Sequence, residues 1–396
     1  NTARHLANAS VLSVALAQWS ISVEYLTPSC TSSSVAAASD CSRLLEVIQC
    51  SASLKMTNFR LQTQGGVHLG YNTPAGRHMH SIGGSASQGM LRSTASECPM
   101  MGVDALDCSC ESARWGSTKD RRPKMGIGQV QRLLPSASAV VPQKPEVRVH
   151  PGLHMLSGGM GSLGLLVAGW LANADIGALW LLGRSGRMAD MQSEMVVQLW
   201  QGRTCASARR CDSSCSEEAA SLVPEAQPLQ GFVHAGGVLQ DAIVTNMTVS
   251  RCRAVFAPKV AGLHNMDTGL QMAAVRSVVM FSSIASLLGG VGQANYAAAN
   301  AALDAAAAVQ QAQGLAGCSV QWGTWAGSGM ALRDAGTMRR AERVGIGVVM
   351  PDVGLAVMAE FMRSAVEGAS GVEVLQVGVA SAFVWPTFLT QVSDAG

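Results

Sequence analysis

Short apolar runs alternate with longer helical stretches from about residue 145 onward. The runs at residues 153–156, 178–182, 231–234 and 277–281 have the length of buried strands, and residues 165–172 and the Ala-rich residues 294–313 have the length of helices. Strand, Gly-rich turn, helix and strand in that order form a βαβ unit. The alternation therefore predicts an α/β fold with a doubly wound parallel sheet of the Rossmann type.

The chain before residue 145 lacks this regularity. Residues 30–39 are rich in Ser and Ala and are predicted to form a loop, and residues 62–90 show little periodicity. Residues 108–135 are polar and basic, which favours a solvated surface loop over a binding patch. The apolar run at residues 11–23 is too short to span a bilayer, so no membrane segment is expected.

Composition narrows the classes of function. Apolar residues make up 48% of the 396 residues and charged residues 14%, which supports a large buried core. The net charge of +2 gives no electrostatic reason to expect nucleic acid or a membrane surface as a partner. The chain begins with Asn1, which suggests a fragment of a longer protein. A signal peptide in the first residues is the less favoured alternative.

The cysteines point to a reducing compartment. There are 11 of them, an odd number at irregular spacing, which favours reduced thiols over disulfides. Cys205, Cys211 and Cys215, and the pair Cys108 and Cys110, are the groups that could hold a metal. They lack a paired CxxC set and a nearby histidine, so no metal is expected. We expect a cytoplasmic protein, with organellar targeting left open.

A dinucleotide-binding loop is predicted between the first strand and helix. Gly159-x-Gly161-x-x-Gly164 has the spacing that allows a tight turn, close approach of a pyrophosphate and close packing of helix on strand. Amides at the helix N-terminus then bind the phosphate charge. The expected cofactor contacts in the loop are Gly158, Gly159, Met160, Gly161, Ser162, Leu163 and Gly164.

The end of the second strand indicates which nucleotide binds. An acidic residue there would bind the ribose 2′-hydroxyl of NAD, whereas this chain has Arg184 and Ser185, with Arg187 close behind. A guanidinium beside a hydroxyl suits a 2′-phosphate, so NADPH is the expected cofactor. An arginine that is merely exposed in a turn is the alternative.

A constellation for ketone reduction is present in the same half. Reduction needs a hydride, a proton donor for the alkoxide and a group that orients the carbonyl; a tyrosine can donate the proton when a nearby cation lowers its pKa. Tyr296 is the only tyrosine in this half and Lys259 the only lysine. Asn300 follows Tyr296 by four residues, on the same helix face. Ser283 lies where a strand is predicted to end. Taken singly, each could be a structural residue.

These residues lie within blocks that resemble the ketoreductases of polyketide synthases, members of the short-chain dehydrogenase superfamily. The resemblance runs in order from about residue 145 to 390. The matching blocks are Ser157-Gly-Gly-Met-Gly-Ser-Leu-Gly164, Gly231-Phe-Val-His-Ala-Gly-Gly-Val-Leu239, Ala257-Pro-Lys-Val260, Phe281-Ser-Ser283, Gly292-Gln-Ala-Asn-Tyr296 and Gln321-Trp-Gly-Thr-Trp-Ala326.

The resemblance implies a role for each residue. Tyr296 protonates the alkoxide, Ser283 binds the carbonyl oxygen, and Lys259 lowers the tyrosine pKa and binds the nicotinamide ribose. Asn300 stands where most of the superfamily has the lysine, and supports Lys259 or a proton-relay water. Ala235, Gly236 and Gly323 line the cofactor. The implied reaction reduces the β-keto group of an acyl thioester, tethered by phosphopantetheine to an acyl carrier protein, to a 3-hydroxyacyl thioester. The implied partners are that carrier and other polyketide synthase domains.

The first half resembles the truncated Rossmann-like structural subdomain that precedes the catalytic one in this family. The similar segments are residues 59–66 and 89–94. We therefore divide the chain into an unassigned segment 1–40, a structural subdomain 41–147 and a catalytic subdomain 148–396. The structural subdomain lacks a dinucleotide loop and is expected to support the catalytic sheet.

The chain departs from the family pattern at three places. The residues before Asp212, which matches the adenine contact, form a poor strand, so this edge of the cofactor site is doubtful. Ser157 replaces a threonine. The Leu-Asp-Asp motif that marks stereochemistry is Leu239-Gln-Asp241, while Leu288 stands where a tryptophan marks the opposite class. The resemblance thus favours the B type, which gives a D-configured hydroxyl.

The same sequence features are compatible with other functions. A reductase of animal-type fatty acid synthase would share the chemistry, and a free-standing short-chain reductase would not need residues 40–150. A silent structural unit, or a unit that only epimerises the α-carbon, would retain the fold without reduction.

Overall fold

The computed structural model describes most of the chain from residue 151 onward and shorter stretches before it. The described residues are 13–17, 20–26, 34–53, 58–64, 82–98, 102–108, 151–174, 176–187, 199, 204–222, 228–270, 275–326, 339, 342–367 and 377–393. They belong to two compact units that interleave along the sequence. Unit 1 comprises Asn1–Leu134, Gln240–Phe256 and Ala285–Ala312, and unit 2 comprises Pro135–Leu239, Ala257–Ile284 and Gln313–Gly396. The predicted boundaries at residues 40 and 147 stay a prediction.

Unit 2 is built on a seven-stranded parallel sheet, as the apolar runs predict. The strand order is β13-β10-β9-β8-β5-β6-β7, with every neighbouring pair parallel. Its strands are β5 (Leu153–Ser157), β6 (Ala178–Gly183), β7 (Cys205–Arg210), β8 (Leu229–His234), β9 (Ser277–Ser283), β10 (Gly317–Trp322) and β13 (Val377–Ala380). The sheet order reverses direction beside β5, so the loops after β5 and β8 open at the position where such folds bind ligands.

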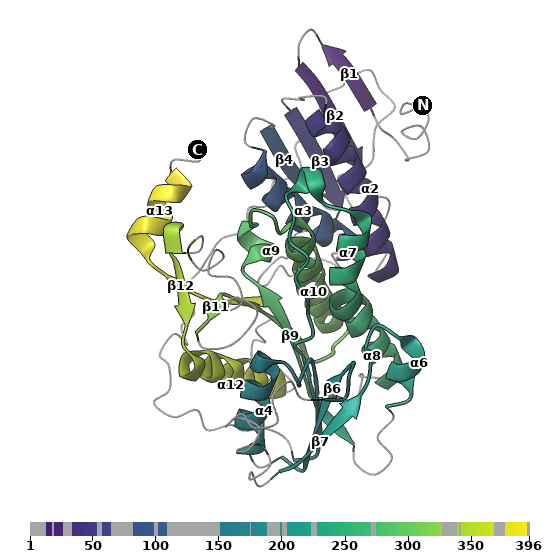
Figure 1. Cartoon of the computed structure of the whole chain (residues 1–396), viewed down its shortest axis with the longest axis vertical. Coiled ribbons are helices and arrows are strands. Elements are labelled where there is room, and N and C mark those ends of the chain that lie inside the picture. Colours follow the sequence, from purple (N-terminus) through teal and green to yellow (C-terminus); the bar gives the residue numbers. More distant parts are fainter. Residues whose placement is uncertain are drawn as a thin grey trace. The chain divides into compact units, whose positions relative to one another are not determined.

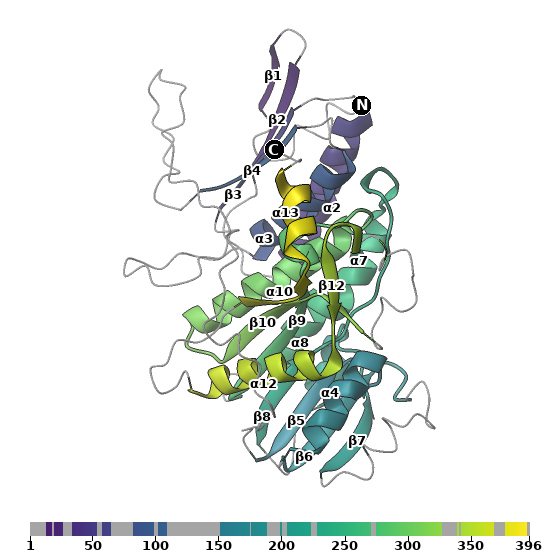
Figure 2. The same cartoon turned by 90° about the vertical axis from the view of Figure 1, so that its left-hand side faces the viewer.

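Helices cover the sheet because their apolar faces need burial. The helices of unit 2 are α4 (Ser162–Ala172), α6 (Ser216–Ala220), the π-helix η2 (Ala257–Ala261), α8 (Gly262–Leu270), α12 (Pro351–Glu367) and α13 (Trp385–Ser393). In Figure 2, α4 and α12 lie side by side against one face of the sheet. A small three-stranded sheet of β11 (Thr324–Trp325), β12 (Ile346–Val349) and β14 (Ala382–Phe383) completes the unit.

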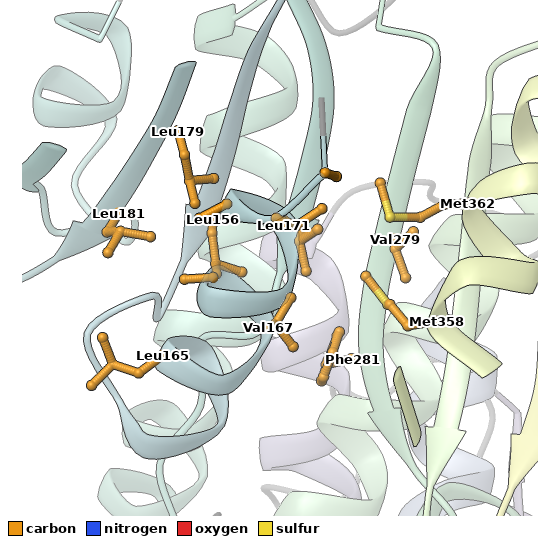
Figure 3. Close-up of a cluster of buried hydrophobic side chains, with 14 of the residues drawn as sticks. Leu156, Leu165, Val167, Leu171, Leu179, Leu181, Val279, Phe281, Met358 and Met362 are labelled. Carbon is orange, nitrogen blue, oxygen red and sulfur yellow. The ribbon is translucent and has the colours of Figure 1, made fainter. Parts of the chain in front are cut away.

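The core of unit 2 lies between the sheet and these two helices. Val167 and Leu171, one turn apart on α4, and Met358 and Met362 on α12 point toward the sheet residues that Figure 3 labels, among them Phe281. All of these side chains are buried. Burial of such side chains stabilises a fold by about 1.5–3 kcal/mol each. The packed core therefore holds the strands, and with them the strand ends, in fixed positions.

The prediction of a poor strand before Asp212 was wrong. Cys205–Arg210 forms β7, parallel to β6 along its whole length, although the segment contains no β-branched or aromatic residue. Ala206 is buried, and the guanidinium of Arg209 lies 4.7 Å from the centroid of the Trp180 ring on β6. Pairing with β6 and these contacts override the weak intrinsic preference of the segment.

Unit 1 contains a four-stranded sheet and a set of helices. The sheet order is β1-β2-β3-β4, antiparallel between β1 and β2 and parallel elsewhere. Its strands are β1 (Ser13–Ala17), β2 (Ser20–Leu26), β3 (Asn58–Gln64) and β4 (Gly102–Cys108). Its described helices are α2 (Ser34–Ser53), α3 (Ile82–Glu97), the 3-10 helix η1 (Val244–Asn246), α7 (Val249–Phe256), α9 (Ala285–Leu288) and α10 (Ala294–Ala312). Figure 1 labels all of these elements except η1. The predicted loop at residues 30–39 was wrong from Ser34 onward, since the small residues there begin α2.

Small residues let two helices of unit 1 approach closely. Alanines cover most of α10, and a Cβ added at Gly89 on α3 would stand 2.6 Å from the carbonyl oxygen of Ala297. Only glycine allows this approach. None of the described helices is both long and apolar enough to cross a membrane.

Candidate active site

The glycine-rich loop joins the end of β5 to the start of α4. Gly158 has φ +70°, and a Cβ there would stand 2.8 Å from the Cα of Gly236 in the segment after β8. A Cβ at Gly164 would stand 2.2 Å from the carbonyl oxygen of Gly158. These two glycines are therefore required by the packing of the loop itself, and for Gly164 this is the close helix–strand packing that the fingerprint predicts.

Gly161 has a different reason to be glycine. It is exposed, its nearest contact for an added Cβ is the carbonyl oxygen of Gly158 at 3.4 Å, and it is the N-cap of α4 without a side-chain cap. The protein described around it leaves room for a side chain, so packing within the chain does not require a glycine here. An uncapped helix N-terminus behind a bare backbone fits a phosphate group.

Positive charge gathers where β6 and β7 end. Arg184 and Ser185 are exposed after β6, with Ser185 Oγ and the backbone N–H of Arg187 3.2 Å apart. The Nε of Arg210, at the end of β7, donates to the carbonyl oxygen of Arg184 over 3.3 Å. No acidic residue follows β6 in the turn Arg184–Arg187, so this edge fits a 2′-phosphate better than a ribose hydroxyl.

Asp212 lies beside this edge because β7 forms. The N–H of Cys211 donates to the carbonyl oxygen of Gly183 over 3.0 Å, which sets Asp212 next to the end of β6. Oδ1 of Asp212 accepts from the N–H and the hydroxyl of Ser214, at 3.0 and 2.7 Å. The backbone N–H of Asp212 donates to Glu218 Oε2 over 2.9 Å. The side chain is thus fixed in a turn at the predicted adenine edge.

Lys259 is a buried cation on a π-helical turn. The backbone of Ala257–Ala261 forms a π-helix, a geometry that occurs mostly as single turns at functional sites. Lys259 is 3% exposed, and its Nζ donates a hydrogen bond of 2.9 Å to the carbonyl oxygen of Phe281 on β9. The lysine that the sequence singles out is therefore held at the end of the strand that carries Ser283.

A histidine that the sequence did not single out connects these parts. His234 ends β8, is fully buried, and its Nε2 lies 2.8 Å from the carbonyl oxygen of Lys259. Its Nδ1 lies 2.8 Å from Oγ of Ser157. A carbonyl only accepts, so Nε2 carries the proton and Nδ1 accepts from the serine hydroxyl. Burial lowers the pKa of His234 to about 4, so the ring is neutral at pH 7.

Ser283 and Gly323 occupy the carboxyl ends of neighbouring strands. Ser283 is the last residue of β9 and is half-buried, opposite Trp322 of β10. Gly323 follows Trp322, its N–H donates to the carbonyl oxygen of Ala380 over 2.8 Å, and a Cβ there would stand 2.5 Å from Ser381 Oγ. Ala235 and Gly236 follow β8 and are half-buried. All four belong to unit 2 and lie at the ends of strands where the fold binds ligands.

Tyr296 and Asn300 lie on α10 in unit 1. Asn295 Oδ1 accepts from the N–H of Tyr296 over 2.8 Å, and Nδ2 of Asn300 donates to the carbonyl oxygen of Tyr296 over 2.8 Å. Tyr296 is half-buried and Asn300 is buried. The predicted pair therefore does share one helix turn, and the two asparagines fix its backbone.

The predicted stereocontrol residues are also connected within unit 1. Oδ2 of Asp241 accepts from Nε2 of Gln293 over 3.2 Å, three residues before Tyr296. Leu288 is the half-buried last residue of α9. Leu239, also half-buried, belongs to unit 2. The structure thus groups the nucleotide loop, Lys259 and Ser283 in one unit, and Tyr296, Asn300, Asp241 and Leu288 in the other. Their joint action on one substrate stays a prediction.

The cysteine groups show no metal geometry where they are described. No group of three His, Cys, Asp or Glu residues within the described part of the chain could hold a metal ion. Cys205, Cys211 and Cys215 are free thiols, and burial raises the pKa of Cys211 to about 11. Cys110 lies outside the described residues.

Comparison with known sequences finds a family match over part of the chain. Residues 152–327 match the family model of the KR domain. Over 211 residues the chain is 36% identical to polyketide synthase GfsB of Streptomyces halstedii, which covers 52% of this chain and 4% of GfsB. It is 39% identical over 215 residues to the spectinabilin polyketide synthase system protein NorB of Streptomyces orinoci, covering 52% of this chain and 10% of NorB. The chain thus spans a small share of these relatives' length.

Solved structures agree on the architecture. The first ketoreductase of the tylosin polyketide synthase superposes with a TM-score of 0.74 at 24% identity, over 94% of this chain and 80% of that one. An A1-type ketoreductase superposes with a TM-score of 0.73 at 25% identity, over 92% and 76% of the two chains. Together with the β5–α4 loop and the seven-stranded sheet, these matches show that residues 152–327 form a KR domain with a Rossmann-type fold, similar to the ketoreductases of polyketide synthases.

Proposed function

We propose that the chain reduces the β-keto group of an acyl thioester to a 3-hydroxyacyl thioester with NADPH, on a substrate tethered to an acyl carrier protein of a polyketide synthase. The observation that carries the proposal is the buried Lys259, held by its hydrogen bond to Phe281 two residues before Ser283. A buried ammonium is costly unless it is hydrogen-bonded or paired, and a buried cation beside the end of a ligand-binding strand is a candidate functional group.

Each residue of the proposed site has one chemical task. Ser283 donates a hydrogen bond to the ketone oxygen and orients it, and Tyr296 donates the proton that neutralises the developing alkoxide. Lys259 stabilises negative charge on the tyrosine oxygen and binds the nicotinamide ribose. Asn300 supports Lys259 or a water that resupplies the proton. The nicotinamide, when bound, would supply the hydride to the β-carbon.

The phosphate loop and the arginines at the sheet edge support NADPH as the cofactor. Gly158, Gly159, Met160, Gly161, Ser162, Leu163 and Gly164 hold the pyrophosphate in this proposal. Arg184 and Ser185 hold the 2′-phosphate, and Asp212 contacts the adenine. Ala235, Gly236 and Gly323 line the nicotinamide half.

The stereochemical proposal is a B-type reductase with a D-configured product. It is supported by Asp241 at the end of Leu239-Gln-Asp241 and by Leu288 in place of a tryptophan eight residues before Tyr296. Asp241 is held by Gln293, so its carboxylate has a fixed position relative to the start of α10.

The experiment uses a β-ketoacyl N-acetylcysteamine thioester with the 396-residue chain. NADPH oxidation is followed by absorbance, and the product by chiral chromatography with mass spectrometry. The proposal predicts a 3-hydroxyacyl product of mainly D configuration and a clear preference for NADPH over NADH. A folded protein that binds NADPH without oxidising it, yet exchanges the α-proton of a 2-methyl substrate, is an epimerising unit instead.

A pair of neighbouring serines provides the matched control. Ser282 is buried and Ser283 is half-buried, and they alternate faces at the end of β9. Ser283→Ala is predicted to lower kcat at least about a hundredfold, the lower end of the range for one lost hydrogen-bond donor to the reacting oxygen. Ser282→Ala, tested beside it, is predicted to change kcat less than about threefold.

A further inference from the structure

One face of α3 contacts the segment that leads to Tyr296. Gly89, Arg92, Ser93 and Glu97 are spaced i, i+3, i+4 and i+8, so they form one stripe along the helix. All the partners described below belong to unit 1 with α3. Figure 1 labels the three helices that take part, α3, α9 and α10.

The upper part of this stripe holds α9 and the turn after it. Nη1 of Arg92 donates to the carbonyl oxygen of Ser286, and the hydroxyl of Ser93 accepts from the N–H of Gly290 over 3.1 Å. Gly289 has φ +75°, and a Cβ there would stand 2.6 Å from the carbonyl carbon of Arg92. The turn is thus pressed against the backbone of α3 and can accept no side chain there.

Glu97 at the end of the stripe bridges two loops that are far apart in the sequence. Its Oε1 accepts from the N–H of Gly292 over 2.9 Å, and its Oε2 accepts from the N–H of Val244. Gly292 lies four residues before Tyr296, and Val244 lies three residues after Asp241. One carboxylate therefore contacts both the loop of the predicted stereocontrol acid and the loop of the predicted proton donor.

The same two loops are also joined directly to each other. The N–H of Ala242 donates to the carbonyl oxygen of Gly292 over 2.9 Å. Nε2 of Gln293 donates to Asp241, and Nδ2 of Asn295 donates to the carbonyl oxygen of Gln240 over 2.9 Å. We call these three bonds, with the two bonds of Glu97, the loop seam. Glu97 lies outside the two loops, and so does Arg251 on α7, whose Nη1 donates to the carbonyl oxygen of Asp241 over 2.8 Å and whose carbonyl oxygen accepts from Nδ2 of Asn295 over 3.3 Å.

A carboxylate is the side chain that this bridge requires. It has two acceptor oxygens and no donor, so it satisfies two backbone N–H groups at once, and hydrogen bonds to a charged acceptor are the stronger kind. Glu97 is half-buried, and burial raises the pKa of its carboxyl while the bonds from Val244 and Gly292 lower it. A glutamine has the same shape but replaces one acceptor oxygen with an NH₂ group that cannot accept, so the N–H that faces this group loses its acceptor.

We propose that Glu97, through the loop seam, is a positioning residue for reduction: it fixes the relative placement of Asp241 and Tyr296 and thereby the rate of proton donation and the face of the ketone that is reduced. The inference rests on the reductase function proposed above. It gives the N-terminal half of the chain a specific part in the chemistry. Misplacement of a reacting group by about 1 Å can lower a rate about a hundredfold, so a small shift of the seam is enough to be measured.

The test compares Glu97→Gln with two control variants on the same helix. Met90→Ala removes a fully buried side chain of α3 and lowers stability without removing an acceptor from the seam. Ser96→Ala removes an exposed hydroxyl that only bonds the carbonyl oxygen of Arg92. Three quantities are measured for each: amide hydrogen exchange at Val244 and Gly292, kcat and KM for the acyl thioester and NADPH, and the ratio of D to L product.

In Glu97→Gln we expect exchange at one of the two amides to rise at least about tenfold, because that N–H has lost its acceptor. We expect kcat to fall about tenfold and the product ratio to fall at least about fivefold, with the KM for NADPH within about twofold of wild type. Met90→Ala and Ser96→Ala should keep the wild-type product ratio.

Three results overturn the proposal, and the last is distinguishable from the first two. Unchanged exchange at both amides, or a Glu97→Gln variant whose kcat and product ratio match those of Met90→Ala, leaves Glu97 a structural residue only. A wild-type chain that does not oxidise NADPH overturns the reductase function, and the positioning role with it.

Discussion

The Nζ of Lys259 donates a 2.9 Å hydrogen bond to the carbonyl oxygen of Phe281, while the carbonyl oxygen of Lys259 itself accepts from His234 over 2.8 Å. The lysine is therefore fixed both at its backbone and at its tip. The π-helical turn around it follows from local chemistry, because Pro258 has no N–H to continue an α-helical ladder. A cation held in this way needs no rearrangement when charge develops near it.

Replacing this cation tests its part in the reaction. Lys259→Met keeps the length and the apolar stem but removes the charge and leaves the Phe281 carbonyl without this donor. We predict that kcat/KM for the acyl thioester falls at least about a hundredfold, measured by NADPH oxidation. The free energy of unfolding should fall by only about 1–3 kcal/mol, the cost of one unpaired buried acceptor. Activity within about threefold of wild type in a folded variant contradicts the role.

Two glycines of the phosphate loop separate folding from cofactor binding. Gly164→Ala places a Cβ 2.2 Å from the carbonyl oxygen of Gly158, whereas Gly161→Ala meets nothing closer than 3.4 Å. We predict that Gly164→Ala lowers the free energy of unfolding by about 1–3 kcal/mol or more, and that Gly161→Ala changes it by less than about 1 kcal/mol. Gly161→Ala should nevertheless weaken NADPH binding at least about tenfold in fluorescence titration, because its methyl group occupies the place of the pyrophosphate. Equal binding by wild type and Gly161→Ala would show that the loop does not bind the dinucleotide.

We expect Arg184, the residue after β6, to determine the preference for NADPH over NADH. Arg184→Ala is predicted to raise the KM for NADPH about tenfold or more and to leave the KM for NADH within about twofold, since only NADPH carries the 2′-phosphate. Arg276, exposed immediately before β9 and thus at the opposite end of a parallel strand, is the matched control. A parallel loss of both cofactors, or the same change in Arg276→Ala, would contradict the assignment.

His234 makes the stability of unit 2 depend on pH. Burial first of all, and the charge of Lys259 in the same direction, lower its pKa to about 4 against the opposing bond to the Lys259 carbonyl, whereas an unfolded histidine titrates near about 6.5. Between these values the unfolded chain binds more protons, so the contribution of His234 is fully present above about pH 6.5 and is lost as the pH falls to about 4. The loss amounts to about 3 kcal/mol.

This dependence is measured by urea denaturation at several pH values. His234→Gln should flatten the fall in the free energy of unfolding between pH of about 6.5 and 4, because glutamine does not titrate. Identical slopes in wild type and His234→Gln would show that the histidine is not held neutral.

The sequence was sufficient for the elements whose pattern is strong. The runs at β5, β6, β8 and β9 are apolar and bounded by glycine or polar residues, so their period and length predict buried parallel strands. The spacing of Tyr296 and Asn300 predicts one helix turn, and α10 provides it. β7 could not be recognised, because its Cys-Ala-Ser-Ala-Arg-Arg sequence has little intrinsic strand preference and depends on pairing with β6.

The sequence pattern does not predict contacts between segments that are far apart along the chain. His234 was visible only as part of a matching block, and nothing local predicts that it bonds both Ser157 and Lys259, which lie 77 and 25 residues away. Glu97 carries no motif at all, since its two partners lie 147 and 195 residues further along the chain. Such residues become apparent only when the fold brings the backbone groups that they bind to one place.

The most direct test of the central claim is the single turnover of a β-ketoacyl thioester by wild type and Tyr296→Phe, each preloaded with NADPH deuterated at the transferred position. We predict that wild type places the deuterium on the β-carbon of a 3-hydroxyacyl product. Tyr296→Phe should bind NADPH equally well but react at least about a hundredfold more slowly, because only the proton donor is missing. Equal rates in the two proteins, or a product without deuterium at the β-carbon, would contradict it.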